Sequence, residues 1–300
     1  MKKLNILVSL TNDENDYQLE QAAAAHEAAH ALEVNVQVIY AGNDTITQSQ
    51  QLLKAIQAHD SRPDAIMFEP VSGTGLPQVA REACAAGIGW VVLNRDVGYI
   101  TELRKSYRVP VFGVSSDHDE IGRIQGRQFA MLLPKGGSVL YIEGPSNSAA
   151  AQQRTAGMQE TKPWNVQVST LRAHWTESSA QQAVASWLRL STSQRAHIDL
   201  VGAQDDSMAM GARKAFEQQA NREKWNGLKF IGCDGLPRTG QSWVKTGLLS
   251  ATVVVPPNTK LALEMLVKNM RTGAALEERG LTVPVSFPPL PSSPQPASNR

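Results

Sequence analysis

The stretch KLNILVSLTNDENDYQLEQAAAAHEAAHALEVNVQVIY, residues 3–40, decides the fold. It opens with a short apolar run (5–10) and continues with an alanine-rich segment long enough for a helix (19–32). It ends with a run of β-branched residues (34–40). A strand, a helix and a second strand with short connections predict a βαβ unit, and therefore a parallel sheet.

The same alternation continues to residue 271. Predicted strands cover residues 5–10, 34–40, 65–68, 90–93, 111–114, 138–142, 166–171, 198–203, 229–232 and 251–255. Predicted helices cover residues 19–32, 49–58, 76–86, 120–133, 149–160, 178–190, 207–219 and 259–271. Ten strands are more than one open sheet holds comfortably. We therefore expect an α/β fold with two doubly wound parallel-sheet lobes.

Composition excludes several classes of protein. The 300-residue chain has 29 Lys and Arg against 28 Asp and Glu, so its net charge of +1 gives no electrostatic case for a nucleic-acid partner. Two cysteines cannot build a disulfide framework. No apolar run approaches the roughly 18 residues of a membrane span, so we expect no membrane insertion.

The two ends of the chain and one internal stretch carry weaker signals. The basic Lys2 and Lys3 precede an apolar run that is too short for a signal peptide and that we interpret as the first strand. The polar stretch 98–110 lacks periodicity and places a change of lobe near residues 114–116. Residues 284–300 hold six of the sixteen prolines, which predicts a surface strap followed by disorder.

Polar side chains follow many of the predicted strands. Asp13 comes after the first strand, Glu69 after the third and Arg95 after the fourth, while Asp205 and Asp234 follow two later strands. Ligands of open parallel sheets bind beyond the carboxyl ends of the strands. Polar strand ends also occur because loops are solvated and because Asp, Asn and Ser cap helices. Their recurrence in both halves favours a cleft between two lobes.

The chemistry of these residues narrows the ligand. Four of these residues are acids and Arg95 is the only base. The set suits hydroxyl groups, because carboxylates accept hydrogen bonds from hydroxyls and a guanidinium group donates hydrogen bonds to them. The ring of Trp175 is a candidate surface for the C–H side of a sugar. The acids would repel a phosphate or a carboxylate. A neutral polyhydroxyl compound fits the set, and a cationic amine fits it as well.

Other motifs do not support an enzyme. The pattern HEAAH (26–30) matches a zinc-protease motif, but the remaining histidines belong to elements assigned to the other lobe. The glycine-rich SGTGLP (72–77) lacks the lysine of a phosphate loop. Cys84 has no organised histidine partner, and no helix-turn-helix precedes the first strand. We expect no catalytic residue, no metal and no cofactor.

Five segments together resemble a known family. They are VVLNRD (91–96), VSSDHDEIGRIQGRQFA (114–130), GPSNSAAAQQRTAGMQE (144–160), AQDDSMAMGARKAFE (203–217) and FIGCDGLPRTG (230–240). In this order and spacing they resemble the type I periplasmic sugar-binding proteins, the ribose/galactose-binding group. The effector domain of LacI-type repressors shares that fold.

The resemblance implies a two-lobed clamshell with a hinge of three segments. The hinge segments fall near residues 115–116, 255–256 and 280–281. The N-terminal lobe then comprises residues 1–114 with 256–280, and the C-terminal lobe residues 115–255 with 281–290. Residues 291–300 form a disordered proline-rich tail.

The resemblance also implies a set of ligand contacts. Carried over by position, they are Ser9, Asp13, Asn15, Asp16, Glu69, Asn94, Arg95, Gln152, Trp175, Asp205, Asp234 and Val255. The family has Asp at Asn94, Arg at Gln152, Asn at Asp205 and Gln at Val255. Because buried polar contacts discriminate strongly between hydroxyl patterns, we expect a ligand other than ribose.

Two functions remain as hypotheses. The first is a monomeric, non-enzymatic protein that captures a sugar or polyol between its lobes for an ABC transporter. The alternative is a cytoplasmic ligand sensor of LacI-like type without a DNA-binding segment. The family implies the periplasm or cell envelope. The lack of a visible signal peptide implies the cytoplasm if Met1 is the true start.

Overall fold

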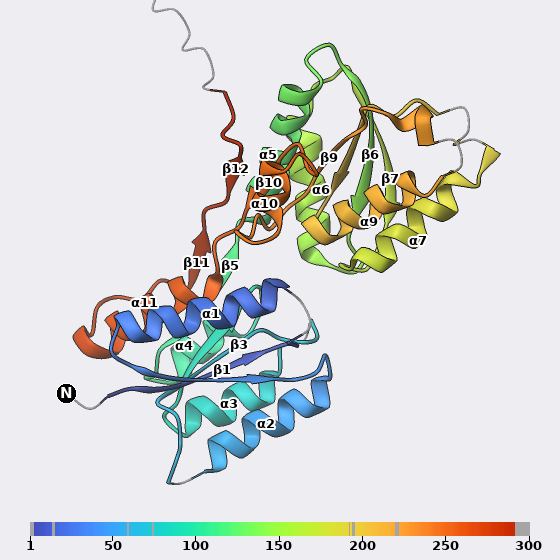
Figure 1. The fold of residues 1–300 in the computed structure, drawn as a ribbon. Coiled ribbons are helices and arrows are strands. Elements are labelled where there is room, and N and C mark those ends of the chain that lie inside the picture. The colour runs from blue at the N-terminus through green and yellow to red at the C-terminus, as the bar shows by residue number, and fades with distance from the viewer. Residues whose placement is uncertain are drawn as a thin grey trace, which may run out of the picture. The chain divides into compact units, whose positions relative to one another are not determined.

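The structure, a computed structural model, describes residues 3–13, 16–58, 60–73, 75–191, 193, 196–219 and 222–291. The chain divides into two units (Figure 1). The first unit comprises Met1–Ser116 and Pro256–Thr282, and the second comprises Asp117–Val255 and Val283–Arg300. The chain therefore passes from one unit to the other three times.

The first unit contains a six-stranded parallel sheet in the order β11-β5-β4-β3-β1-β2. Along β1, Ile6 and Val8 pack into one apolar cluster and Leu7 packs into the other, on the opposite face. Burial of both faces explains why these strands are continuous apolar runs. The strands are β1 (Asn5–Leu10), β2 (Asn35–Tyr40), β3 (Ala65–Phe68), β4 (Gly89–Leu93), β5 (Val111–Ser116) and β11 (Arg279–Thr282).

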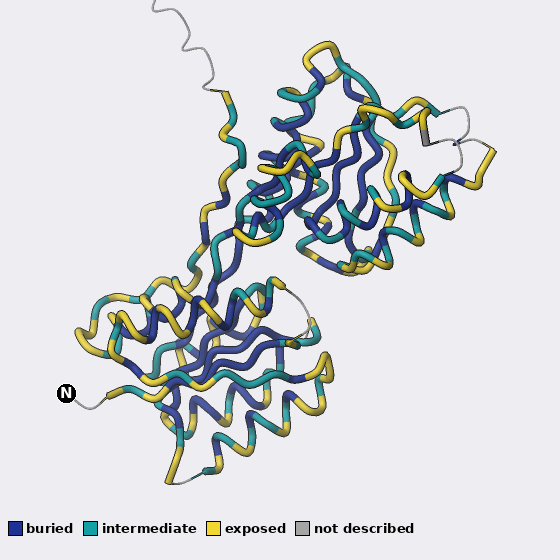
Figure 2. The backbone as a smooth tube through the Cα atoms, in the orientation of Figure 1, coloured by how far each residue is buried: buried dark blue, intermediate teal, exposed yellow. Residues whose placement is uncertain are grey.

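Helices cover both faces of this sheet. On one face, α1 (Asp16–Ala31) packs beside α11 (Asn258–Thr272), and the Oγ1 of Thr259 donates to the carbonyl of Gln21 at 2.7 Å. On the other face lie α2 (Thr45–Gln57), α3 (Pro77–Ala85) and α4 (Ile100–Ser106). Figure 2 shows the strands buried and the outer helix surfaces exposed.

The second unit repeats this plan with a four-stranded parallel sheet in the order β7-β6-β8-β9. Its strands are β6 (Gly137–Glu143), β7 (Val166–Arg172), β8 (Leu200–Ala203) and β9 (Lys229–Ile231). On one face lie α5 (His118–Leu132) and α6 (Ala149–Thr161). On the other lie α7 (Glu177–Leu188) and α9 (Asp206–Glu217). The unit also contains η1 (Arg222–Trp225), α10 (Gly240–Lys245), β10 (Thr252–Val254) and β12 (Val285–Phe287).

Side-chain caps set where several helices begin. Asp44 accepts from the amide of Thr47 at 2.6 Å, so α2 starts before the apolar periodicity that predicted a helix from residue 49. Ser148 caps α6 in the same way, and Asp205 caps α9. Each cap satisfies one of the amides that a first helical turn leaves without a partner.

The prediction of two doubly wound parallel-sheet lobes is confirmed, but three elements of the structure were not predicted. Stretch 98–110 contains the helix α4, whose seven residues bury only Ile100 and Leu103 and are too short to show periodicity. The proline-rich segment 284–291 contains β12, which pairs antiparallel with β10. A further strand, β11, was not predicted and joins β5 in parallel. The predicted disordered tail lies, from residue 292 onward, outside the described residues.

Candidate functional site

Both sheets reverse their strand order at one internal point. In the first unit the chain order runs outward in opposite directions from β1 and β3, which are neighbours. In the second unit the corresponding neighbours are β6 and β8. The carboxyl ends of the strands at such a switch point leave a crevice where open α/β sheets bind ligands. Each unit therefore has one candidate edge, at the carboxyl ends of its strands.

Glu69 lies directly at the switch point of the first unit. Its amide donates to the carbonyl of Ser9 at 2.9 Å, and its side chain is 5% exposed. The two carboxylate oxygens accept from Gln18 Nε2 at 2.8 Å and from Asn94 Nδ2 at 3.1 Å. Burial raises the pKa of Glu69, while these two hydrogen bonds and the charge of Arg95 oppose that rise.

Asn94 and Arg95 each have one buried polar atom that makes no hydrogen bond to the other described residues. The backbone of Asn94 has φ 56°, which turns the chain sharply at the end of β4. Asn94 Oδ1 and Arg95 Nε are buried atoms with no hydrogen-bond partner among the described residues. Leaving such atoms without a partner is costly, so an acceptor and a donor are available here to a polar ligand.

The remaining predicted residues of the first unit differ in their surroundings. Ser9 is fully buried, and its Oγ accepts from Gln48 Nε2 at 3.3 Å. Asp13 is exposed near Tyr40, whose pKa is raised first by burial and second by this carboxylate. Asp16 is exposed at the start of α1. Asn15 lies outside the described residues.

Gln204 and Arg154 hold the edge of the second unit together. Gln204, the residue after β8, accepts from the amide of Gly144 at 2.8 Å and donates to Thr155 Oγ1 at 2.9 Å. Arg154 is only 7% exposed, and its Nη1 donates to the carbonyl of Gln204. Its guanidinium carbon lies 5.6 Å from the centre of the Trp175 ring, a cation–π arrangement.

Three carboxyl groups share this edge. Asp205 Oδ1 accepts from the amide of Met208 at 2.5 Å, and burial raises the pKa of Asp205 to about 6. Asp206 accepts from Thr252 Oγ1 at 2.7 Å and from the amide of Gly235 at 2.8 Å. Burial, and then the charge of Asp234, raise the pKa of Asp206 well above its usual value. Asp206 thereby ties β10 and the loop after β9 to the start of α9.

The other three predicted residues of the second unit fall into different environments. The Trp175 ring lies against Gly144, where an added Cβ would come within 2.2 Å of the ring. Gln152 is exposed on α6, and its Nε2 donates to the carbonyl of Ser146 at 2.7 Å. Val255 is 3% exposed and packs in an apolar cluster. The Trp175 ring thus lies beside Arg154, and the amide of Val255 donates to the carbonyl of Asp234 at 3.0 Å, while the Gln152 side chain bonds only to the preceding loop among the described residues.

The sequence analysis did not place three residues that shape the two edges. All three are buried: Gln18 and Arg154 donate to residues that follow strands, and Gln204 accepts from the amide of Gly144 and donates to the carbonyl of Ala151 on α6. Arg154 had a signal, since it lies two residues beyond the position where the family has an arginine. Gln204 directly follows a predicted strand. Gln18 had no signal, because it lies within a helix far from Glu69 in sequence.

The described residues contain no group of three or more His, Cys, Asp or Glu side chains that could hold a metal ion. His26 and His30 of the HEAAH motif are exposed on α1. Such exposure is ordinary for polar side chains on the outer face of a helix. Both cysteines are buried and free. In the part of the chain that the structure describes, no helix has the length and apolar character needed to cross a membrane.

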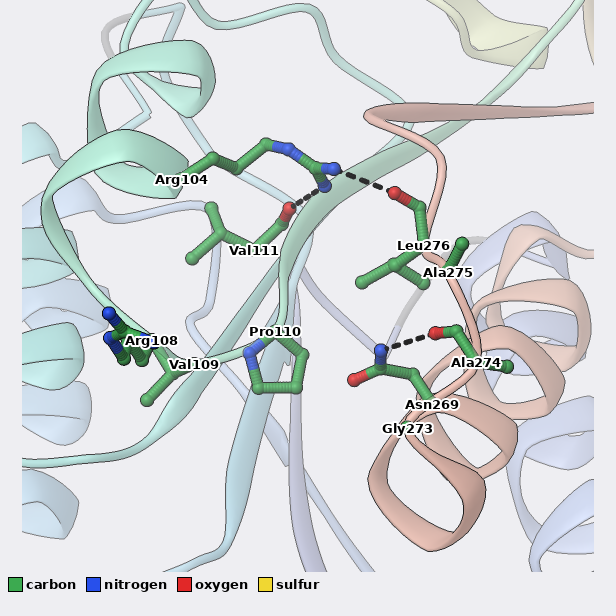
Figure 3. A pocket seen from close by; sticks show the side chains of 10 residues that line it. All are labelled: Arg104, Arg108, Val109, Pro110, Val111, Asn269, Gly273, Ala274, Ala275 and Leu276. Atoms are coloured by element: carbon green, nitrogen blue, oxygen red, sulfur yellow. Dashed lines mark hydrogen bonds between the residues drawn. The ribbon is translucent and has the colours of Figure 1, made fainter.

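A cavity of about 330 Å³ lies at the opposite end of the first sheet, beside the start of β5 (Figure 3). Arg104 reaches across it, and its Nη1 and Nη2 donate to the carbonyls of Val111 at 2.7 Å and Leu276 at 2.6 Å. Asn269 donates to the carbonyl of Ala274 at 2.8 Å. These bonds tie the segment that leads to β11 onto the sheet, and they place the cavity away from the carboxyl ends.

Comparison with known proteins identifies the family. The sequence profile described as periplasmic binding protein domain matches residues 6–274, so the chain belongs to that family. The D-ribose/D-allose-binding protein of Pseudomonas aeruginosa is 29% identical over 250 residues, which are 82% of this chain and 74% of the relative. The putative rhizopine-binding protein of Rhizobium meliloti is 28% identical over 191 residues, 61% of this chain and 58% of the relative.

Solved structures show the same fold. The Caulobacter myo-inositol binding protein bound to myo-inositol superposes with a TM-score of 0.76 at 22% identity, covering 94% of this chain and 92% of that chain. A periplasmic solute binding protein from Actinobacillus succinogenes with bound D-allose gives 0.80 at 21% identity, covering 95% and 97%. The protein is thus a non-enzymatic solute-binding protein with the type I periplasmic binding fold. These matches give no support to the LacI-like sensor.

Proposed function

We propose that this protein captures a sugar or polyol at the carboxyl ends of its strands, and that its two units close on the ligand. The observation that carries the proposal is that both units have a switch point and that polar, largely buried side chains gather at each one. The relatives named D-ribose/D-allose-binding and myo-inositol binding proteins support a small polyhydroxyl ligand.

On the first unit, Asn94 and Arg95 contact the ligand, and Glu69 holds Asn94 in place. On the second unit, Asp205, Asp234 and Trp175 contact it, while Arg154 and Gln204 position them. Ser9, Gln152 and Val255 are left out of this set because the first and last are buried in the interior and Gln152 is turned to solvent. The three passages of the chain between the units act as the hinge.

Closure supplies the signal for a partner. A ligand that touches both units stabilises the closed state by its higher affinity for that state. We propose that an ABC transporter reads the closed form and receives the ligand. The test of this partner is copurification: the ligand-loaded protein should be recovered together with the permease that a neighbouring transport operon encodes. Equal recovery with and without ligand would contradict a readout of closure.

The test of binding is a thermal-shift screen across pentoses, hexoses and cyclitols, followed by calorimetry on the compounds that raise the melting temperature. Arg95→Ala should weaken binding by about 2–5 kcal/mol, because it removes a charged partner of the ligand. Arg81→Ala is the matched control, since Arg81 is half-buried on α3, where it donates to Gln78 at 3.2 Å and lies 3.5 Å from Glu102. Equal affinities of the two variants would refute the proposed site.

A further inference from the structure

The chain crosses between the two units after residues 116, 255 and 282. The number of residues that can bend in each crossing depends on how the ends of that crossing are held. Hydrogen bonds within each unit hold these ends, and in both units they converge on one buried side-chain amide. The two amides belong to Asn258 in the first unit and to Gln128 in the second.

In the first unit, the Asn258 side chain joins the ends of all three crossings. Its Oδ1 accepts from Ser116 Oγ at 3.5 Å and from Thr282 Oγ1 at 3.3 Å. Ser116 and Thr282 are the last residues before the first and third crossings, and Asn258 lies just after the second. Asn258 Nδ2 donates to Tyr17 Oη at 3.2 Å, which ties the group to α1. Ser116, Asn258 and Thr282 are all buried, so breaking these contacts leaves polar atoms without water to replace them.

In the second unit, Gln128 has the corresponding position. It is fully buried on α5, the helix that begins just after the first crossing. Its Nε2 donates to the carbonyl of Thr252 in β10 and to the Oγ of Ser286 in β12, both at 2.9 Å. Strand β10 leads to the second crossing, and β12 follows the third. One side chain therefore ties together the ends of the three crossings in this unit as well.

Little of the chain lies between these two groups of hydrogen bonds. At the first crossing, Asp117 already caps α5. At the second, the amide of Val255 donates to a carbonyl of the second unit at 3.0 Å, which leaves Pro256 and Pro257. At the third, residues 283–284 precede β12, and the second of them is a proline. Because proline fixes φ, few backbone angles can change when the units change their orientation.

We propose that Asn258 and Gln128 are positioning residues for ligand capture, which hold the ends of the hinge so that the units open and close by rotation at these few residues only. Neither side chain contacts the ligand. A hinge that is held at both ends samples fewer orientations, so closing on a ligand loses less conformational entropy. The consequence for affinity rests on the proposed function, whereas the restriction of the hinge does not.

Asn258→Ala and Gln128→Met test the restriction by removing one amide each. Nitroxide labels on Glu27→Cys in α1 and Gln182→Cys in α7, both exposed, report the distances between the units by double electron–electron resonance. Both native cysteines are buried, which directs labelling to the introduced ones. The spread of a flexible segment grows with the square root of its length, so doubling the residues that bend should broaden the distance distribution about 1.4-fold.

Thr259→Val is the matched control for Asn258→Ala. Thr259 is the next residue of α11, is fully buried and donates to the carbonyl of Gln21 at 2.7 Å, so its hydroxyl ties α11 to α1 and not to the hinge. This variant should lose stability and keep the width of the distribution. Labels on Glu27→Cys and Lys54→Cys, which lie on helices at opposite faces of the first sheet, should give one width in every variant if the first unit stays intact.

Thr282→Val and Ser286→Ala are milder variants that each remove one hydroxyl from one of the two groups. They replace Asn258→Ala and Gln128→Met if circular dichroism shows that either of these does not fold, and they should broaden the distribution in the same direction. Widths equal to that of the wild type in folded variants would overturn the inference. Broadening that also occurs in Thr259→Val would overturn the assignment to Asn258.

Calorimetry with D-allose and myo-inositol tests the consequence for ligand capture. Both compounds should bind about three- to tenfold more weakly to Asn258→Ala and Gln128→Met than to the wild type, and by the same factor, because neither residue contacts the ligand. Broader distributions with unchanged affinities would show that the hinge is restricted but that the restriction has no role in capture. If no compound of this or the wider screen binds the wild type, the proposed function fails, and the distance distributions still decide the restriction of the hinge.

Discussion

The two units place a buried carboxylate at equivalent points of equivalent sheets and stabilise it in different ways. In the first unit, Glu69 is surrounded by side-chain amides from α1 and from the end of β4, with Arg95 beside it. In the second unit, Asp205 and Asp206 accept mainly from backbone amides and a hydroxyl, and Arg154 is their buried cation. The carboxylate of the first edge is therefore held by several neutral side-chain donors, whereas the carboxyl groups of the second edge rely on one buried arginine.

Arg154→Met is the sharpest test of that dependence. Removing the cation leaves the buried Asp205 without the opposite charge that Arg154 supplies, so the free energy of unfolding should fall by about 3–5 kcal/mol. Urea denaturation followed by tryptophan fluorescence measures the change. Arg172→Met is the control, because Arg172 is exposed and pairs with Glu143 at 3.6 Å, a contact worth about 1 kcal/mol or less. Similar losses in both variants would contradict the dependence on Arg154.

Asp205→Asn tests the same edge through pH. The pKa of Asp205 rises from 3.8 to about 6 on folding, so the folded state holds the proton more tightly than the unfolded state. Its contribution to stability is therefore greatest below pH 4 and is lost as the pH rises toward 6. The free energy of unfolding of the wild type, minus that of Asp205→Asn, should fall by about 2–3 kcal/mol across this range. A difference that is constant with pH would show that Asp205 has an ordinary pKa.

Glu69→Ala examines the first edge. Gln18 Nε2 and Asn94 Nδ2 would lose their shared acceptor, and the free energy of unfolding should fall by about 2 kcal/mol. Glu69→Gln retains one acceptor oxygen and should be less damaging. Both are measured by urea denaturation. If Gln destabilises as much as Ala, the charge that faces Arg95 matters more than the amide contacts, and the contrast between the two edges weakens.

Ser148→Ala gives the smallest expected effect. Ser148 caps α6, the helix that carries Arg154, and accepts from the amide of Ala151 at 3.4 Å. Loss of a helix cap costs about 1 kcal/mol. The melting temperature of this variant is to be compared with that of Ser146→Ala, an exposed serine in the preceding loop. Equal melting temperatures would show that the start of α6 is held by packing and not by its cap.

The fold was predictable because its signals are local. Apolar runs such as 5–10 and 90–93 are buried on both faces, so each reads as a strand without knowledge of its neighbours. Asp13, Glu69, Arg95, Asp205 and Asp234 were recognisable as strand-end residues for the same reason. Two short elements were not predicted. Helix α4 buries only two apolar side chains, and β12 is a strand only because it pairs with β10, which is distant in the sequence.

The environment of each candidate residue was not predictable in this way. Gln18 and Glu69 are 51 residues apart in sequence, and Arg154 and Gln204 are 50 apart. Nothing in the local pattern reports that such pairs meet. Val255 and Gln152 show the same limit, since position in the family pattern names them as ligand contacts but does not report that one packs in an apolar cluster and that the other is exposed.

The sequence by itself determined the alternation of strands and helices, the two-sheet fold and the acidic character of the strand ends, because these depend on residue type and short-range spacing. Only the tertiary structure decided which carboxyl groups are buried, which amides and cations face them and which polar atoms are left without a partner. Those properties depend on burial and on contacts between segments that are distant in the sequence.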